Sequence, residues 1–468
     1  MAWSLKKKKA DYLENSITEG VIWKTLLSFF FPILLGTFFQ QMYNTVDAII
    51  VGKFVGKEAL AAVGGTTGSI INLIVGFFTG LASGATVILS QYYGGRKYKE
   101  VGQTVHTAFA MAIAGGLLIM AFGLVMAPAM LRMLDTPEDI MAYSLRYLRI
   151  YFAGMVPSLI YNIGSGLLRA VGDSRRPLFF LIIACMTNVV LDVVFVVGLE
   201  MHVAGAALAT ILSQLVSAVL VSVTLMRSGT AYRLELKKIR FHAEQLKRIV
   251  TIGLPAGLQS MAYSVSNAIV QTSINGFGTD VVAAYTAYGK LDAFNWMLQG
   301  AFGVSITTFA GQNFGARQYE RVKKGVRVCL AMSAAATLVL SGFLLLTGET
   351  LYRLFTDDPV VVELGMKMLK LLAPVFVLYV CIEIFSGALR GAGDSVRPTI
   401  ITLSGVCALR MLWLLVIVPM NRTLDMVLYC YPLTWTVTSL LFVLYYYRSG
   451  WMKRCIHKAG LDRPLEEN

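Results

Sequence analysis

Long apolar runs alternate with short polar segments along the whole chain. Most runs are long enough to cross about 30 Å of hydrocarbon as an α-helix, which takes about 20 residues. The strict alternation of apolar and polar positions that is typical of a transmembrane β-strand is absent. The pattern predicts an all-α polytopic membrane protein with twelve transmembrane helices. They are expected near residues 21–52, 59–91, 103–131, 141–168, 177–198, 203–226, 248–276, 282–312, 325–347, 361–389, 396–418 and 424–447.

The polar segments between the runs carry most of the basic charge. If the N-terminus is cytoplasmic, the cytoplasmic segments hold 30 of the 41 Lys and Arg residues. This asymmetry follows the positive-inside rule and predicts that both termini are cytoplasmic. Only 15% of the residues are charged and 56% are hydrophobic, which again indicates a membrane protein. The net charge of +14 therefore reflects topology, and no nucleic-acid partner is expected.

Two halves of the chain repeat one plan. "LRAVGDSRRP" at 168–177 matches "LRGAGDSVRP" at 389–398, 221 positions later, and Pro32 corresponds to Pro255. An even number of helices per copy gives both copies the same orientation in the membrane. The expected organisation is an N-terminal tail (1–20), an N-lobe (21–226), a basic linker (227–247), a C-lobe (248–447) and a C-terminal tail (448–468).

The repeated loops allow two interpretations. A glycine permits the tight turn, an aspartate can cap the following helix, and a proline suits its first turn. The loops are then purely structural. The alternative is that their charged residues form part of a gate.

Four polar residues of the N-lobe lie inside apolar helices at a similar depth. Asn188 and Asp192 are four residues apart and share one helical face. At 1.5 Å per residue, Asp192, Thr210 and Asp47 each lie about 8–10 Å from the outer helix ends. No Lys or Arg of this lobe reaches that depth, so two carboxylates are left near each other. The group favours a proton, or a cation such as Na⁺ bound through oxygen ligands. The alternative is that each residue only joins helices through hydrogen bonds.

The C-lobe carries different polar residues. Leu409 and Trp413 stand opposite Asn188 and Asp192, and Val270 or Ile269 stands opposite Asp47, so the second copy lacks these carboxylates. Its candidates for polar contacts are Lys290, Asp292, Glu383 and Arg410. Glu383 either pairs with Arg410 or Lys290, or provides an acidic contact for a cationic substrate.

No pattern of an enzyme is present. The six cysteines and four histidines are scattered, without the spacing of a metal site or a disulfide framework. No nucleophile–base motif appears either. We expect a transporter rather than an enzyme, without a cofactor.

The chain resembles the multidrug and toxic compound extrusion (MATE) transporters over residues 21–447. The resemblance rests on "NTVDAIIVG" at 44–52, on the two repeated loops and on twelve helices in two lobes. It implies the MATE fold, two pseudo-symmetric lobes of six helices each. In the prokaryotic branch with an acidic N-lobe cluster, the ion-coupling residues match Asp47, Asn188, Asp192 and Thr210. The resemblance also implies that helix 1 bends at Pro32 for gating. Further candidates for substrate contacts are Gln41, Asn44, Tyr147, Asn162, Asp292 and Glu383.

The resemblance implies an antiporter of the bacterial cytoplasmic (inner) membrane. It would be coupled to H⁺ or Na⁺ and export amphipathic, mostly cationic drugs or toxic metabolites by alternating access. Its partners would be small organic molecules and the lipid bilayer, and we expect a monomer. The alternative is a flippase for lipid-linked precursors from the same wider superfamily.

Overall fold

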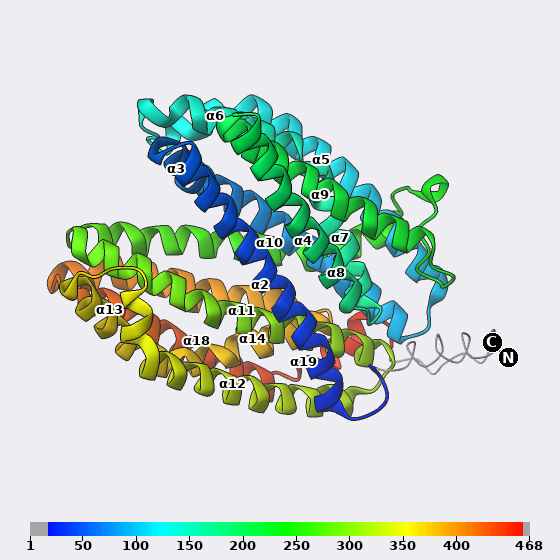
Figure 1. Cartoon of the computed structure of the whole chain (residues 1–468). Helices are drawn as coiled ribbons and strands as arrows, with labels where there is room; N and C mark the ends of the chain where they lie inside the picture. The colour runs from blue at the N-terminus through cyan, green and yellow to red at the C-terminus, as the bar shows by residue number, and fades with distance from the viewer. Residues whose placement is uncertain (1–16, 462–468) are drawn as a thin grey trace. The chain divides into compact units, whose positions relative to one another are not determined.

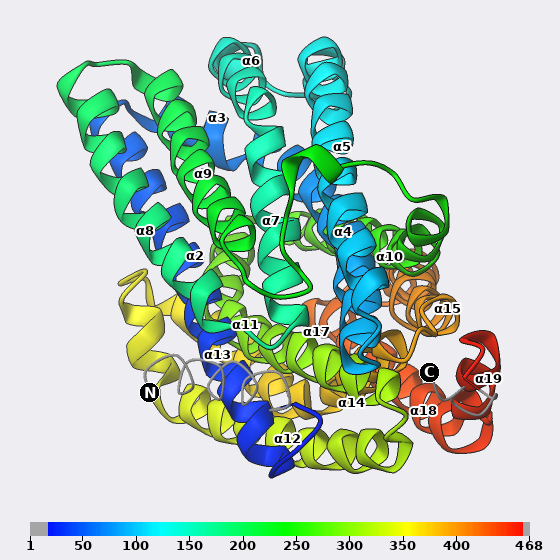
Figure 2. The ribbon, with the colours of Figure 1, turned by 90° about the vertical axis from the view of Figure 1, so that its right-hand side faces the viewer.

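The computed structural model describes residues 17–461, and almost all of them are helical, with no strand among them (Figures 1 and 2). The chain divides into two compact units. Within the described residues, unit 1 comprises Phe31–Gly257, and unit 2 comprises residues 17–30 and 258–461. The all-helical fold expected from the hydrophobic pattern is confirmed.

Unit 1 contains most of α2 and the elements up to the first part of α10. They are α2 (Ile22–Phe54), α3 (Lys57–Gly64), α4 (Thr66–Gly94), α5 (Tyr98–Met133), α6 (Glu138–Ala153), α7 (Met155–Ala170), α8 (Arg175–Asp192), the π-helical η1 (Val193–Gly198), α9 (His202–Met226), the 3₁₀ turn η2 (Leu236–Lys238) and α10 (Ala243–Asn275).

Unit 2 contains the rest of α10 and all later elements. They are α11 (Thr279–Gly315), α12 (Tyr319–Arg353), α13 (Pro359–Leu372), η3 (Ala373–Val375), α14 (Phe376–Gly391), α15 (Val396–Thr402), the π-helical η4 (Leu403–Ala408), α16 (Leu409–Leu412), the π-helical η5 (Trp413–Ile417), η6 (Val418–Met420), α17 (Leu424–Leu428), α18 (Cys430–Arg448) and α19 (Trp451–Lys458).

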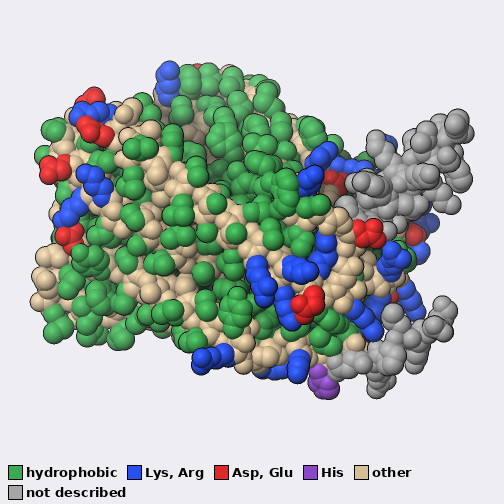
Figure 3. Space-filling model, turned by 90° about the horizontal axis from the view of Figure 1, so that it is seen from below, with side chains coloured by type: hydrophobic (Ala, Val, Ile, Leu, Met, Phe, Trp, Pro, Cys, Tyr) green, Lys and Arg blue, Asp and Glu red, His purple; other side chains and the backbone are tan. Residues whose placement is uncertain are grey.

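Nine helical segments of the described chain are long and apolar enough to cross a membrane. The three other predicted spans, 141–168, 248–276 and 282–312, are also helical and correspond to α6–α7, α10 and α11. On the face drawn in Figure 3, hydrophobic side chains cover the middle, and charged side chains gather toward the two ends. Both observations agree with twelve membrane-spanning segments.

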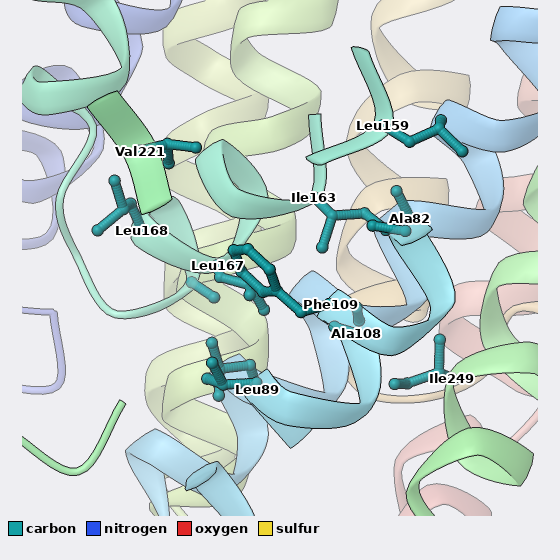
Figure 4. Close-up of a cluster of buried hydrophobic side chains, with 14 of the residues drawn as sticks. Ala82, Leu89, Ala108, Phe109, Leu159, Ile163, Leu167, Leu168, Val221 and Ile249 are labelled. Atoms are coloured by element: carbon teal, nitrogen blue, oxygen red, sulfur yellow. The ribbon is translucent and has the colours of Figure 1, made fainter. Parts of the chain in front are cut away.

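Helix packing within each unit repeats, as the sequence repeat predicts. In unit 1, α7 packs against α4, α5 and α9, and in unit 2 the corresponding α14 packs against α11, α12 and α18. The core of unit 1 contains buried side chains of α4, α5, α7, α9 and α10, such as Leu89, Phe109, Ile163, Val221 and Ile249 (Figure 4). Each unit is therefore a bundle around one central helix.

Glycines bring α4 and the first part of α10 into backbone contact within unit 1. A Cβ at Gly84 would collide with the backbone of α10 at Ile249, and one at Gly253 would collide with the carbonyl of Leu81. Gly80 and Gly257 make the same close approach one turn away. Small residues four apart on both helices permit this contact, which is a common way to pack helices in lipid.

The boundaries of the two units fall inside helices, not in the basic linker. Helix α2 changes unit between Phe30 and Phe31, and α10 between Gly257 and Leu258. Pro32 and Pro255 lie next to these positions, and each removes a backbone hydrogen bond from its helix. The compact units thus differ in extent from the lobes 21–226 and 248–447, because each first helix contributes its early residues to the other unit.

Specific contacts hold the two exchanged segments. In unit 2, Phe30 stacks on Phe302 of α11 with ring centroids 4.1 Å apart. The Arg321 guanidinium of α12 donates hydrogen bonds to the carbonyls of Glu19 and Gly20, at 3.0 and 2.9 Å. In unit 1, the amide of Gln245 on α10 donates to Gln103 Oε1 of α5 at 3.3 Å.

The repeated loops have a structural role in both units. Gly172 has φ 106° and Gly393 has φ 94°, a left-handed conformation that favours glycine. In each copy the glycine N–H and the following aspartate N–H bond back to carbonyls of the preceding helix, and this closes its C-terminus. Asp173 then accepts a hydrogen bond from the Arg176 N–H at 3.1 Å and so caps α8. These bonds support the structural interpretation of the loops.

The segment after α9 is attached to α5 by two histidines. His106 Nε2 accepts a hydrogen bond from the Glu235 N–H at 3.1 Å. The backbone N–H of His242 donates to Thr107 Oγ1 at 3.2 Å, and Arg240 Nε donates to His242 Nε2 at 3.2 Å. Because Nε2 accepts, Nδ1 carries the proton and donates to Thr107 Oγ1 at 3.0 Å. The predicted linker 227–247 is thus anchored on unit 1.

Replacing Gly84 or Gly253 with alanine should destabilise unit 1 by about 1–3 kcal/mol, because the new methyl group meets backbone that cannot move locally. Thermal unfolding of the purified protein measures the change. Gly342→Ala is the matched control, since nothing lies within 4 Å of a Cβ there. Equal melting temperatures for Gly84→Ala and Gly342→Ala would contradict the close approach of α4 and α10.

Acidification should release the linker from α5. Burial and the positive charge of Arg240 lower the pKa of His242 below its ordinary value. His242 therefore binds a proton more readily when the linker is detached from α5. Above the ordinary histidine pKa of about 6.5, His242 stabilises the attached linker in full. This stabilisation is lost as the pH falls below that value. Hydrogen exchange of the amides of residues 231–242, corrected for intrinsic rates, should accelerate between pH of about 7.5 and about 5.5. His242→Gln should show no such pH step, and a step of the same size in that variant would exclude His242 as its cause.

Candidate functional site

The four predicted ion-coupling residues are all buried in unit 1. Asp47 lies near the end of α2, Asn188 and Asp192 lie on α8, and Thr210 lies on α9. Asn188 and Asp192 are completely buried, and Asp47 and Thr210 are 6% and 4% exposed. Asp192 is also the last α-helical residue before the π-helical η1. Such interruptions of an α-helix are frequent at functional sites.

The two carboxyl groups lie close enough to interact electrostatically with each other. Among the described residues, no Lys or Arg forms an ion pair with either of them. Asp47 Oδ1, both oxygens of Asp192 and both polar atoms of the Asn188 amide also have no hydrogen-bond partner in that part of the chain. The expectation of two neighbouring carboxylates without a cationic partner agrees with this geometry.

Tyrosines and a glutamine lie around the carboxylates; the sequence analysis named Tyr147 as a candidate and missed Tyr43, Tyr151 and Gln214. The hydroxyl of Tyr147 on α6 lies near both Asp47 and Asp192. Tyr43, one helical turn before Asp47, and Tyr151, one turn after Tyr147, both interact with the side chain of Gln214. The spacing of four residues could have found them, since Tyr43, Tyr151 and Gln214 each follow or precede a predicted site residue by four positions.

An apolar cluster adjoins the polar group where α2 ends and α9 begins. It combines Ile50 and Val51 of α2, Val196 of η1 and Val203 of α9 with the ring of Tyr147. All five side chains are less than a tenth exposed. Tyr147 belongs to both clusters, so its ring packs in the apolar cluster while its hydroxyl lies beside the carboxylates. This packing keeps water away from one end of the polar group.

The other residues predicted in unit 1 lie outside this group or make local contacts. Gln41 and Asn44 are both exposed on α2, whereas Asp47 is buried. The Asn162 amide donates to the Ser158 carbonyl of its own helix at 2.8 Å. Thr210 Oγ1 likewise donates to the Ala206 carbonyl, at 3.0 Å, and its lone pairs stay available to a ligand. Pro32 lies inside α2, fifteen residues before Asp47.

In unit 2, the predicted partner of Glu383 is not found. None of the ion pairs of the described residues includes Glu383, Lys290 or Arg410. The Glu383 carboxylate lies against Gly303 of α11, where a Cβ would collide with it. Asp292 accepts a hydrogen bond from Trp296 Nε1 at 2.6 Å. The interpretation of Glu383 as the ion-pair partner of Arg410 or Lys290 is therefore wrong: its carboxylate occupies the space left by a glycine and interacts with the more distant Arg390 instead.

The donor set of unit 1 consists of oxygen atoms. Two carboxylates, the Asn188 carbonyl and the Thr210 hydroxyl suit a hard cation or a proton. The described residues contain no group of three or more His, Cys, Asp or Glu side chains that could hold a metal ion.

Replacing Asp192 with asparagine should leave the melting temperature unchanged or raise it. The substitution removes a buried carboxylate that has no partner, and such a group opposes folding. Asp394→Asn is the control, because Asp394 accepts a hydrogen bond from Tyr445 and pairs with Arg397 at 3.6 Å. We expect that control to lose about 1–2 kcal/mol in thermal unfolding. A loss of the same size for Asp192→Asn would mean that its carboxylate has a structural role.

Comparisons with known proteins agree on one family. The MatE family matches residues 32–194 and 255–415, once in each repeat. The chain is 30% identical over 400 residues to the probable multidrug resistance protein YpnP of Bacillus subtilis, covering 84% of this chain and 88% of YpnP. It is 24% identical over 443 residues to the probable multidrug resistance protein YoeA of the same organism, covering 93% and 95%. A solved outward-facing multidrug resistance MATE transporter has the same fold, with a TM-score of 0.87, 22% identity and coverage of 96% and 99%. The chain therefore belongs to the MatE family, the MATE transporters.

Proposed function

We propose that this protein is an antiporter that exports amphipathic, mostly cationic compounds in exchange for H⁺ or Na⁺. The observation that carries the proposal is the pair Asp47 and Asp192, buried in unit 1: within residues 17–461 neither carboxylate has a cationic partner, and Asp47 Oδ1 and both Asp192 oxygens have no hydrogen-bond partner. A buried carboxylate without a partner is costly, so the pair has a strong tendency to take up a cation.

Exchange follows from competition for one acidic group. An entering proton or sodium ion neutralises Asp47 and Asp192, and Asn188 and Thr210 provide further oxygen ligands. A cationic substrate loses its electrostatic attraction to the site at the same moment and is released. Ion and substrate then need no long-range signal to exclude each other, because both use the same carboxylates.

Helix α2 is suited to link the ion to a change of conformation. It carries Asp47, changes unit between Phe30 and Phe31, and lacks a backbone hydrogen bond at Pro32. Neutralising Asp47 changes the forces on the part of α2 that follows the proline. The helix can then bend at Pro32 and alter access to the site, which is the alternating access proposed here.

The membrane potential sets which exchanges gain energy from voltage. Moving one elementary charge across 100 mV is worth about 2.3 kcal/mol. Two ions entering for one monovalent cation leaving would use this energy, whereas a one-for-one exchange would not. Two neighbouring carboxylates are compatible with either ratio.

The relatives' names and the charge pattern support the remaining features. YpnP and YoeA are both named as probable multidrug resistance proteins of a bacterium. Together with the basic segments, this favours a multi-pass protein of the bacterial cytoplasmic membrane with both termini inside. We propose that it acts as a monomer, since each unit packs around its own central helix.

Transport by purified protein in vesicles tests the proposal. Ethidium efflux should follow an imposed proton or sodium gradient, and Asp47→Asn and Asp192→Asn should each reduce the gradient-driven rate about tenfold or more, which corresponds to about 1.4 kcal/mol or more of activation free energy. The control is Asp280→Asn, an exposed carboxylate of α11, which should transport like wild type.

Two outcomes would reject parts of the proposal. Gradient-driven efflux that is unchanged in both Asp variants would reject the assigned site. Movement of a lipid-linked precursor without any ethidium efflux would instead favour a flippase. Separate gradients of pH and sodium in the same vesicles identify the coupling ion.

A further inference from the structure

The linker 227–247 carries an exposed face that is both apolar and basic. Leu236 and Phe241 are 63% and 50% exposed, although they lie outside the apolar runs expected to span the membrane. Lys237, Lys238 and Arg240 stand between them in the sequence and are exposed as well. The linker crosses the end of α5 on its way from α9 to α10 (Figure 2). Two large apolar side chains are therefore left uncovered among cations.

Contacts on the opposite face fix the linker to unit 1. Leu234 is only 2% exposed, and Ile239 packs against the hydrophobic core of unit 1. The backbone N–H groups of Glu235 and His242 donate hydrogen bonds to side chains of α5. Buried and exposed residues thus alternate along one attached segment. Its exposed face is held in one orientation and points away from the protein.

The attachment points of the linker lie inside an apolar run. His106 and Thr107 of α5 accept its backbone hydrogen bonds and fall within the run 103–131. At 1.5 Å per residue they lie about 5–6 Å from the start of that run. The next apolar run begins at Arg248, directly after the linker. The linker is therefore held beside the boundary between hydrocarbon and water.

Most cations of this segment have no acidic partner. Residues 227–248 contain seven Lys and Arg residues. Two of them form ion pairs, Lys238 with Glu235 at 2.9 Å and Arg248 with Glu244 at 3.2 Å. The other five are exposed and take part in none of the ion pairs of residues 17–461: Arg227, Arg233, Lys237, Arg240 and Lys247. This face is complementary in charge to an anionic surface.

A role as a simple tether between the repeats explains the face poorly. The positive-inside rule accounts for the cations, but not for Leu236 and Phe241 among them. In water, each exposed apolar side chain costs free energy that burial would recover. Anionic lipid headgroups attract basic segments beside a membrane, and apolar side chains that insert among the headgroups add to the binding. The two features together favour a lipid surface over a soluble anion.

We propose that the linker 227–247 binds anionic phospholipids of the cytoplasmic leaflet. Leu236 and Phe241 insert among the headgroups, and unpaired cations such as Arg233 and Lys237 contact the lipid phosphates. The inference uses the orientation proposed above, with the basic segments inside, and does not depend on the substrate or the coupling ion. A linker held by lipid on one face and by α5 on the other detaches less readily.

Hydrogen exchange of the full-length protein in bilayers of two compositions tests the proposal. At neutral pH, the linker amides should exchange about tenfold or more slowly in phosphatidylcholine that contains phosphatidylglycerol than in phosphatidylcholine alone, because each cation near an anionic surface contributes about fivefold. High salt should reduce the difference, since it screens exposed charges. Equal exchange in the two bilayers would overturn the proposal.

A pair of variants with equal loss of charge locates the effect. Arg233→Gln/Lys237→Gln removes two unpaired cations and none of the contacts that hold the linker, so its melting temperature should match wild type. It should lose most of the slowing. Lys453→Gln/Lys458→Gln removes two exposed cations of α19 and should keep the slowing in full. The same slowing in both variants would exclude the linker cations as its cause and overturn the proposal.

Two further measurements distinguish lipid from other anions. Leu236→Ser/Phe241→Ser removes only exposed side chains and should abolish the slowing that remains at high salt. Inorganic phosphate added to the wild-type protein in detergent should leave exchange of the linker unchanged. If phosphate slowed the exchange as much as phosphatidylglycerol does, the face would bind a soluble anion and the lipid proposal would be rejected.

Discussion

The cost of burying carboxylates away from water governs the architecture of unit 1. An aspartate inside a membrane helix costs about 2.5–3.5 kcal/mol on insertion scales, and this unit buries two that interact with each other. Nothing in the described chain repays that cost through an ion pair. The helices that hold Asp47 and Asp192 must therefore be fixed by other contacts. The apolar packing around Val51, Val196 and Tyr147 provides them.

Close helix packing in the rest of unit 1 also stabilises the bundle that holds the two carboxylates. Lipid offers no hydrophobic driving force between helices, so stability depends on surfaces that fit closely. Gly84 and Gly253 allow backbone contact between α4 and α10, and the core around α7 is filled by branched and aromatic side chains. A rigid bundle of this kind can hold Asp47 and Asp192 in place despite the free-energy cost of burying their carboxylates. Under the proposed function, a cation that binds these carboxylates would remove that cost and could thereby change the conformation of the molecule.

The sequence predicted the positions of site residues correctly where regular helix geometry determines which face and depth a side chain has. The spacing of Asn188 and Asp192 places them on one face of α8, and counting residues from the helix ends brings Asp47 to the same depth. Tyr43 and Gln214 were missed because a single tyrosine or glutamine in an apolar helix is common, although each stands four positions from a predicted site residue. The pairing of Glu383 with Arg410 failed for a related reason: opposite charges on two helices suggest a pair, but α14 directs its carboxylate toward Gly303. The boundaries of the two units could not be predicted from the sequence either, because the apolar runs continue across Phe30 and Gly257 without a break.

The crossing of α2 and α10 from one unit into the other bears on how such a repeat could arise. Residues 17–30 complete the bundle made by the second repeat, and residues 243–257 complete the bundle made by the first. Two separate copies of such a repeat could make the same exchange, each leading segment completing the other copy's bundle as in a domain-swapped dimer. In the present chain the exchange takes place within one polypeptide.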